Sequence, residues 1–275
     1  MPATMPNGHE RPPVSGPIAA ASLEPFPARI PFADPPGSPR LNVTCSRCAL
    51  RGACVPGGLS PSELAEFERA VQVHTKRRIG SRRYLYRSGD AARALYALRS
   101  GFIKTSITID DGREQVTGFH MMGDIVGLET LLGERHGSDA VALENAEVCE
   151  IPFAALDELC VDMPGLKRRL YQMVGREFQH ERESRVLLGT MRAEERLASF
   201  LLELGQRYAT RGYSAVRFLL RMSRADIGSY LGLRLETVSR LFSRFQTQGL
   251  LRVEHKSVEI LDASALRFVI GRIVN

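Results

Sequence analysis

The sequence lacks any apolar run long enough to cross a membrane: no stretch approaches the roughly 18 to 20 uninterrupted apolar residues of a spanning helix. Its first residues also lack a basic segment leading into an apolar run, so we expect no secretory leader. Hydrophobic residues make up 44% of the 275 positions and charged residues 25%, which allows a sizeable core. These features predict a cytoplasmic globular protein without a membrane partner.

The common signatures of enzymes are also missing. The sequence contains no convincing acid/base pair, nucleophile motif or phosphate-binding loop. Isolated histidines such as His74 and His120 have no second ligand at metal spacing and are read as structural residues. We therefore do not expect an enzyme.

Proline is scarce after residue 40 and abundant before it. Eleven of the fifteen prolines lie in residues 1–40, interleaved with alanine, serine and glycine. Such a segment cannot bury enough apolar surface to offset the entropy lost on ordering. We predict a disordered tail over residues 1–40 and a compact fold after it.

Positive charge is concentrated at the other end of the chain. Residues 191–275 carry fourteen basic and eight acidic side chains, which accounts for the whole net charge of +6. A local basic surplus is the electrostatic footprint of a nucleic-acid contact, although ordinary solvated surface can carry one too. The C-terminal region is therefore the first candidate for nucleic-acid binding.

The region from about residue 76 to 153 has short extended runs separated by glycines. Residues 102–109 predict a strand, and the following Asp-Asp-Gly-Arg predicts a tight turn with positive φ at Gly112. Many short strands with turn signals favour a small antiparallel roll or barrel. The glycines of this pattern are Gly80, Gly89, Gly101, Gly112, Gly118, Gly123 and Gly127.

After Pro164 the apolar period becomes helical and predicts about 23 residues of helix, roughly 35 Å long. A helix of this length between two domains is a candidate for pairing with its twin, although it could instead pack only on its own roll. Continued at heptad spacing, the predicted seam is half polar, which indicates a weak, easily switched dimer. The seam consists of Leu166, Leu170, Met173, Glu177, His180, Ser184 and Leu187.

A helix-turn-helix is predicted between residues 223 and 248. Ser223 and Asp226 have capping-box spacing at the start of a short helix, and Gly232 ends it. A second helix over residues 235–248 turns Val238, Leu241, Phe242 and Phe245 inward. Residues 250–260 then alternate around His255, Lys256 and Ser257, as the hairpin of a wing would.

The outer face of the second helix suits the reading of bases. Glu236 can accept from a cytosine amine, Arg240 can donate two hydrogen bonds to guanine, and Ser239 can contact a base edge or a thymine methyl. Glu236 and Arg240 are four residues apart, so an ordinary surface ion pair is the alternative interpretation. The glycine turn, the wing and the basic surplus favour DNA.

Cys45, Cys48 and Cys54 form a C-x2-C-x5-C cluster, with Cys149 and Cys160 far downstream. Three closely spaced thiols can share one metal centre, and a remote fourth would complete a set for an iron-sulfur cluster or a zinc ion; thiol redox chemistry is a further alternative. Spacing alone does not distinguish Cys149 from Cys160.

The order of these features resembles the CRP/FNR superfamily of bacterial transcription regulators, and within it the FNR branch of oxygen-responsive fumarate and nitrate reduction regulators. The resemblance covers about residues 42–260. The segments that carry it are residues 45–54, LYALRSG at 95–101, QVTGFH at 115–120, VCEIPF at 148–153, AEERL at 193–197, DIGSYLGL at 226–233 and ETVSR at 236–240.

The resemblance implies an α+β fold: a cyclic-nucleotide-binding-like antiparallel β-roll, or jelly roll, with a long dimerisation helix and a C-terminal winged helix-turn-helix. After the disordered tail at 1–40, which the composition predicts, we expect an iron-sulfur sensory roll at 41–160, a dimerisation helix at 161–190 and a DNA-binding domain at 191–275.

The resemblance also implies a mechanism. A 4Fe-4S cluster on Cys45, Cys48, Cys54 and Cys149 would favour a homodimer, and oxygen would destroy the cluster and switch DNA binding off. Glu236, Ser239 and Arg240 would read a double-stranded palindrome resembling TTGAT and ATCAA separated by four base pairs, and surface loops would contact RNA polymerase in activation or repression. If Glu177, Glu181 or Glu183 faces its symmetry mate, repulsion would poise the dimer near dissociation.

A cyclic-nucleotide receptor of the same superfamily is an alternative. It would need an arginine followed by a small hydroxyl residue to hold the nucleotide phosphate. In this sequence Arg135 is displaced, and Asp139 would repel a phosphate. A zinc or thiol-redox regulator that uses the same cysteines is the other alternative.

Overall fold

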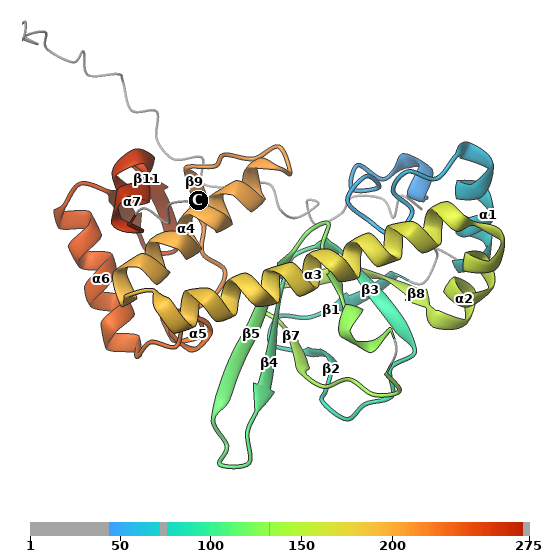
Figure 1. Cartoon of the computed structure of the whole chain (residues 1–275), viewed down its shortest axis with the longest axis horizontal. Helices are drawn as coiled ribbons and strands as arrows, with labels where there is room; N and C mark the ends of the chain where they lie inside the picture. The colour runs from blue at the N-terminus through green and yellow to red at the C-terminus, as the bar shows by residue number, and fades with distance from the viewer. Residues whose placement is uncertain (1–43, 72–75, 132, 272–275) are drawn as a thin grey trace, which may run out of the picture. The chain divides into compact units, whose positions relative to one another are not determined.

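The computed structural model describes residues 44–71, 76–131 and 133–271. The predicted tail at residues 1–40 lies outside these ranges. Of the described helices, none is both long and apolar enough to pass through the hydrocarbon core of a bilayer. The described residues form the expected combination of antiparallel sheets, a long helix and a helix-turn-helix (Figure 1).

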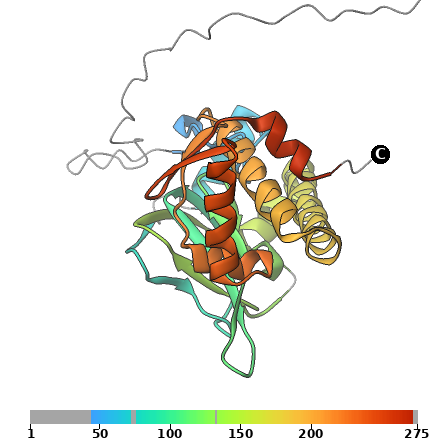
Figure 2. The same ribbon diagram turned by 90° about the vertical axis from the view of Figure 1, so that its left-hand side faces the viewer.

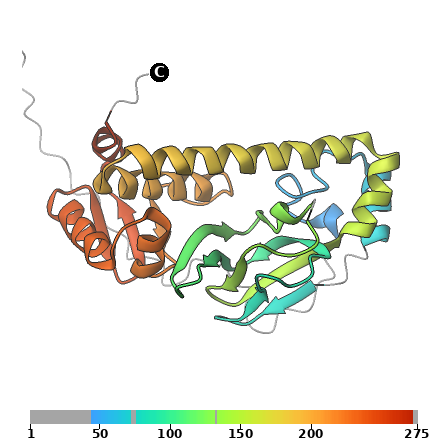
Figure 3. The ribbon, with the colours of Figure 1, turned by 60° about the horizontal axis from the view of Figure 1, so that its bottom comes forward.

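The roll consists of two four-stranded antiparallel sheets, which Figure 3 shows below the long helix. One sheet has the order β1-β8-β3-β6 and the other β2-β7-β4-β5. The predicted strand and turn are confirmed: β4 pairs with β5 in a hairpin, and Gly112 has a φ of 84°. The strands are β1 Lys76–Ile79, β2 Tyr84–Tyr86, β3 Ala94–Ser100, β4 Phe102–Thr108, β5 Glu114–Met121, β6 Ile125–Val126, β7 Asp139–Ala142 and β8 Ala146–Pro152.

Short helices flank the roll. A 3-10 turn, η1, covers Cys45–Arg47 and a second, η2, covers Leu128–Thr130. Helix α1, Pro61–Val71, buries Leu64, Phe67 and Val71, and helix α2 spans Phe153–Asp162. Neither α1 nor α2 was predicted from the sequence. Both pack into one hydrophobic cluster with the start of the long helix.

The long helix α3 extends over Pro164–Thr190, with a proline in its first turn, where the missing N–H costs no hydrogen bond. Its first half does not carry the predicted seam on an outer face. Leu166, Leu170 and Met173 are only 0%, 7% and 7% exposed, because they pack into the cluster formed with α1 and α2. Val174 and Phe178 of the same helix are instead exposed. A helical period fixes a stripe but does not say what covers it.

The C-terminal helices follow α3 after an extended residue, Met191. They are α4 Ala193–Ala209, α5 Arg224–Leu231, α6 Leu235–Thr247 and α7 Ala263–Val269. The predicted wing is confirmed in β10 Leu251–Glu254 and β11 Ser257–Ile260, with His255 at a φ of 56°, and β9 Arg217–Leu219 adds a third strand beside β11. Figure 2 shows α6 and the wing together, in orange and red.

The helix-turn-helix forms for the local reasons read from the sequence. The Ser223 hydroxyl accepts a hydrogen bond from the Asp226 N–H at 3.0 Å, and the Asp226 carboxylate accepts one from the Ser223 N–H at 2.9 Å. Gly232 ends α5 with a φ of 63°, in the left-handed region that favours glycine. Val238, Leu241, Phe242 and Phe245 of α6 are buried, as predicted.

Candidate functional site

The three clustered cysteines are placed by a series of tight turns. The Cys48 N–H donates to the Cys45 carbonyl at 3.2 Å, and the Cys54 N–H donates to the carbonyls of Leu50 and Arg51 at 3.1 Å each. These turns fold the chain back on itself between residues 45 and 54. Val55, fully buried directly after the loop, anchors it in the core. Three sulfurs are thus held within one short loop.

Cys149 joins the same site from the centre of a sheet. It lies on β8, paired with Ala97 of β3 on one side and with β1 on the other. Cys45, Cys48, Cys54 and Cys149 line one cavity of about 40 Å³, whose walls are otherwise largely apolar. Cys160, on α2, packs against the neighbouring hydrophobic cluster but does not line this cavity. The four thiols named by the resemblance share a single site.

Burial makes this pocket a poor place for an uncompensated negative charge. Desolvation, followed by repulsion from Cys149 and Glu68, raises the pKa of the Cys45 thiol to about 12. Desolvation likewise raises the pKa of Cys54 to about 12. All five cysteines lie in the described part of the chain, and none forms a disulfide there.

The donor set fits a thiolate-bound cluster better than a single preformed ion site. Within residues 44–71, 76–131 and 133–271, no three His, Cys, Asp or Glu side chains are close enough together to hold one metal ion. Four thiols around a mostly apolar pocket are nevertheless the donor chemistry of an iron-sulfur cluster. The four residues therefore fit such a group by their chemistry.

Arg169 connects the cysteine loop to α3. Its guanidinium donates to the Gly52 carbonyl at 2.7 Å and to the Cys54 carbonyl at 3.3 Å. This contact could not be predicted from the sequence, because one arginine among several on a helix gives no indication of its partner. The loop that carries three cysteines is therefore attached directly to the long helix.

The predicted base-reading residues lie together on one exposed surface. Glu236, Ser239 and Arg240 are exposed on α6, on the side away from its buried face. The alternative of a surface ion pair is not realised: among the described residues, none of the salt bridges joins Glu236 to Arg240. Arg244, one turn later, is instead paired with Glu194 of α4. The side chain of Arg240 is thus available for a ligand.

Comparison with known proteins adds a second line of evidence. The Crp-like helix-turn-helix domain family matches residues 195–269, and the cyclic nucleotide-binding domain family matches residues 76–162. The chain is 42% identical over 228 residues to the "Transcriptional regulatory protein btr" of Bordetella pertussis, covering 83% of this chain and 93% of that protein. It is 41% identical over 229 residues to the "Fumarate and nitrate reduction regulatory protein" of Vibrio cholerae, covering 83% and 91%.

The chain belongs to the CRP/FNR family of transcription regulators. Its fold is also that of FixK2 from Bradyrhizobium japonicum, with a TM-score of 0.68 and 31% identity over 73% of this chain and 98% of that one. This CRP/FNR regulator therefore carries a DNA-binding helix-turn-helix domain, and its family is one of regulators rather than enzymes.

Three aromatic side chains of this CRP/FNR regulator pack against one another in the roll. Tyr86 and His136 stack with ring centroids 3.5 Å apart, Tyr96 lies 5.8 Å from Tyr86, and all three are buried. Arg135 donates to the Gly89 carbonyl at 2.6 Å, and Asp139 accepts from the Ser88 N–H at 2.8 Å. Arg135 and Asp139 thus form hydrogen bonds within the protein, which argues against the cyclic-nucleotide alternative.

Proposed function

We propose that this chain is an oxygen-responsive transcription regulator of the anaerobic type, acting in the cytoplasm on double-stranded DNA. Cys45, Cys48, Cys54 and Cys149 would hold a 4Fe-4S cluster, and oxygen would destroy it and switch DNA binding off. The observation that carries the proposal is the single pocket that these four thiols line, although one of them lies about a hundred residues from the others. Relatives named as anaerobic or fumarate and nitrate reduction regulators support it.

The four cysteines would act as the cluster ligands, and the surrounding fold would hold their side chains in place. When bound, the iron-sulfur core provides chemistry that oxygen can attack. Desolvation in the pocket disfavours the thiolate forms of Cys45 and Cys54, and a cationic iron centre would stabilise them. Arg169 of α3 is hydrogen-bonded to two carbonyls of the loop, so a rearrangement of the loop would displace this part of the helix or break these hydrogen bonds.

A homodimer through α3 is part of the proposal, but with a different seam from the one the sequence indicated. Tyr171, Val174 and Phe178 are exposed by 65%, 41% and 63% and recur at spacings of three and four residues. Continued at that spacing, the stripe reaches Glu181 and Arg185, both exposed. Glu183 lies off this stripe and lines a cavity toward α4. An apolar half and a charged half on one face fit a dimer that is easily switched.

The dimer seam can be tested by two substitutions of opposite sign. Phe178→Asp should raise the monomer fraction, because it places a charge in an apolar contact, whereas Glu181→Ala should raise the dimer fraction by removing a charge that faces its own copy. A coupling of about 1 to 3 kcal/mol corresponds to a change of roughly 5- to 150-fold in the dimer equilibrium. Sedimentation of the anaerobic protein measures both effects.

A matched control for the seam is Phe268→Asp. Phe268 is 86% exposed on α7, so it presents the same side chain to solvent at a position outside the stripe. The control should leave the monomer fraction unchanged. An equal change in the two phenylalanine variants, or no change for Glu181→Ala, would contradict the proposed seam.

DNA recognition is proposed for α6. Glu236, Ser239 and Arg240 of each subunit would read one half of a palindrome that resembles TTGAT and ATCAA separated by four base pairs. Two copies related by a two-fold axis present two such helices, which is the geometry that a palindrome requires. Contact of surface loops with RNA polymerase, in activation or repression, remains a prediction.

Anaerobic purification tests the proposal as a whole. We expect a brown protein with about four iron and four sulfide per chain, which binds the palindrome and loses both colour and binding in air. One zinc per chain would support the structural-metal alternative. A colourless protein that binds the palindrome only with cyclic AMP would support the nucleotide receptor. Iron-free protein that binds the palindrome normally would overturn the proposal.

A further inference from the structure

The turn between β5 and β6 forms a wall of the cysteine pocket. Gly123, with a φ of 88°, lines the cavity together with the four cysteines, and a Cβ built on it would lie 3.5 Å from the Ala53 methyl of the cysteine loop. The Gly123 N–H donates to the Leu98 carbonyl at 2.8 Å, and the Leu98 N–H donates to the Asp124 carbonyl at 2.9 Å. The turn is therefore fixed to β3 and lines the same pocket as the loop that carries three cysteines.

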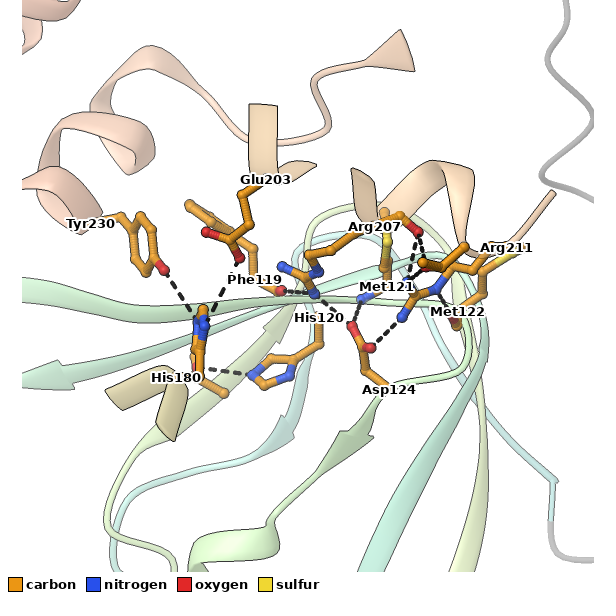
Figure 4. A network of polar contacts seen from close by, with 12 residues as sticks. Phe119, His120, Met121, Met122, Asp124, His180, Glu203, Arg207, Arg211 and Tyr230 are labelled. Atoms are coloured by element: carbon orange, nitrogen blue, oxygen red, sulfur yellow. Dashed lines mark hydrogen bonds and ion pairs between the residues drawn. The ribbon is translucent and has the colours of Figure 1, made fainter. Parts of the chain in front are cut away.

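The next residue of the same turn is held by the DNA-binding domain. The Asp124 carboxylate accepts from the Arg207 guanidinium at 2.6 Å and also from that of Arg211 (Figure 4). Arg207 lies on α4, and Arg211 lies in the turn that follows this helix. Arg207 donates further to the Phe119 carbonyl at 2.7 Å, and Arg211 to the carbonyl of Met122. Two cations from the C-terminal end of α4 and the turn after it thus hold a single turn of the roll.

The carboxylate in this clamp is ionised. Burial by itself would raise the pKa of Asp124, but the charges of Arg207 and Arg211 hold it below its ordinary value. The side chains of Arg207, Arg211 and Asp124 are 27%, 12% and 22% exposed, so solvent screens the pairs only in part. Within the described ranges, neither arginine has a salt bridge to any other carboxylate. A shift of the turn would leave two partly buried cations without their partner.

Aromatic packing carries this connection on to the helix-turn-helix. The ring of Phe119 on β5 lies 6.0 Å from that of Phe200 on α4 and 5.3 Å from that of Tyr230 on α5, measured between centroids. Arg196 of α4 donates to the Leu231 carbonyl at the end of α5 at 3.0 Å. Helices α4 and α5 would therefore move with the turn.

We propose that Asp124 is a positioning residue which couples the state of the cysteine pocket to the placement of the DNA-binding helices within one chain. This route runs from the pocket wall through the Arg207 and Arg211 clamp to α4, and it is separate from dimerisation through α3. The inference rests on the proposed function, because it needs a pocket whose contents change.

Asp124→Asn tests the coupling with the smallest change in shape. Anaerobic full-length protein would be compared with the same protein after iron removal by a chelator, measuring iron per chain, dimer fraction and affinity for the palindrome. The readout is the ratio of palindrome affinities of the loaded and iron-free forms. We expect Asp124→Asn to keep wild-type iron content and dimer fraction in the loaded form while this ratio falls at least about fivefold, the lower end of typical allosteric coupling.

Arg211→Gln provides a second variant that breaks the clamp from the segment directly after α4 and leaves the sequence of the β5–β6 turn intact. It should lower the affinity ratio in the same way. If Asp124→Asn fails to fold or loses iron, Arg211→Gln decides the outcome. A wild-type ratio in Arg211→Gln, or in iron-loaded Asp124→Asn, would overturn the coupling.

Lys104→Gln is the matched control, because it breaks a different contact between the roll and the helix-turn-helix. Lys104 donates to Asp226 of α5 at 2.9 Å and to Glu114 at 2.8 Å, and it does not line the cysteine pocket. This variant should change the affinities of both forms by the same factor and leave their ratio unchanged. A ratio lowered as much as in Asp124→Asn would show that docking in general, not the pocket wall, is responsible.

The inference and the proposed function fail in different ways. Wild-type protein that holds no iron, or that binds the palindrome equally well with and without it, would overturn the proposed function. Iron-loaded wild type with a large affinity ratio, together with an Asp124→Asn variant of the same ratio, would overturn the coupling alone.

Discussion

Cys149→Ala is expected to abolish iron retention and to weaken anaerobic binding to the palindrome by about 5- to 150-fold, the range of a coupling of 1 to 3 kcal/mol. Cys149 lies on a central strand and lines the pocket opposite the cysteine loop. It is the one sulfur of the four that this loop does not supply. Without it, a cluster would have three protein ligands, all on a single loop.

The measurement is iron content by chemical analysis together with operator binding by anaerobic titration. Cys160→Ala is the control, because this cysteine is also partly buried near the same hydrophobic cluster but does not line the pocket. We expect the control to keep about four iron per chain and full affinity. Full affinity in Cys149→Ala, or equal losses in the two variants, would remove Cys149 from the ligand set.

The stability of the fold is expected to be affected little by this change. Cys149 is half-buried, and its backbone is held by ladder hydrogen bonds on both sides of β8. Alanine preserves that backbone and removes one sulfur. A thermal transition close to that of iron-free wild type would therefore separate loss of a ligand from loss of the fold.

Local signals in the sequence predicted the elements that local chemistry determines. The capping box at Ser223, the left-handed Gly232 and the inward stripe of α6 are each fixed by residues a few positions apart, and each has the predicted form. The same applies to the hairpin around Gly112. Helix α4 carried an equally readable signal, since Leu197, Leu201 and Leu204 recur at helical spacing and are buried.

Features that depend on distant partners could not be read in the same way. The stripe that begins at Leu166 was assigned to a partner copy, but α1 and α2 cover it within the chain. Asp124 and Arg207 are 83 positions apart, and no sequence pattern around either residue indicates that the other is its partner. The four thiols could be predicted only in part. The spacing of the loop cysteines indicated a metal centre, whereas the choice of Cys149 came from the family resemblance. The shared pocket is seen only in the structure.

Arg240→Ala is expected to weaken binding to the palindrome by about 1 to 3 kcal/mol per half-site, the value of a bidentate contact between arginine and guanine. Arg240 is exposed on α6 and has no salt bridge in the described part of the chain, so the loss would not come from a broken intramolecular pair. Binding to DNA of unrelated sequence should change little, because that binding depends on phosphate contacts.

The base-pair assignment can be tested by changing the protein and the DNA together. Replacing the guanine of TTGAT with adenine should weaken binding of the wild type, but it should have little further effect on Arg240→Ala, because the contact is already absent. Arg244→Ala is the control on the same helix, because Arg244 is paired with Glu194. The change from guanine to adenine should weaken DNA binding by this variant by the same factor as it does for the wild type. If Arg240→Ala still distinguishes guanine from adenine by the full wild-type factor, another residue reads that position. The proposal that Glu236, Ser239 and Arg240 are the base-reading residues must then be revised.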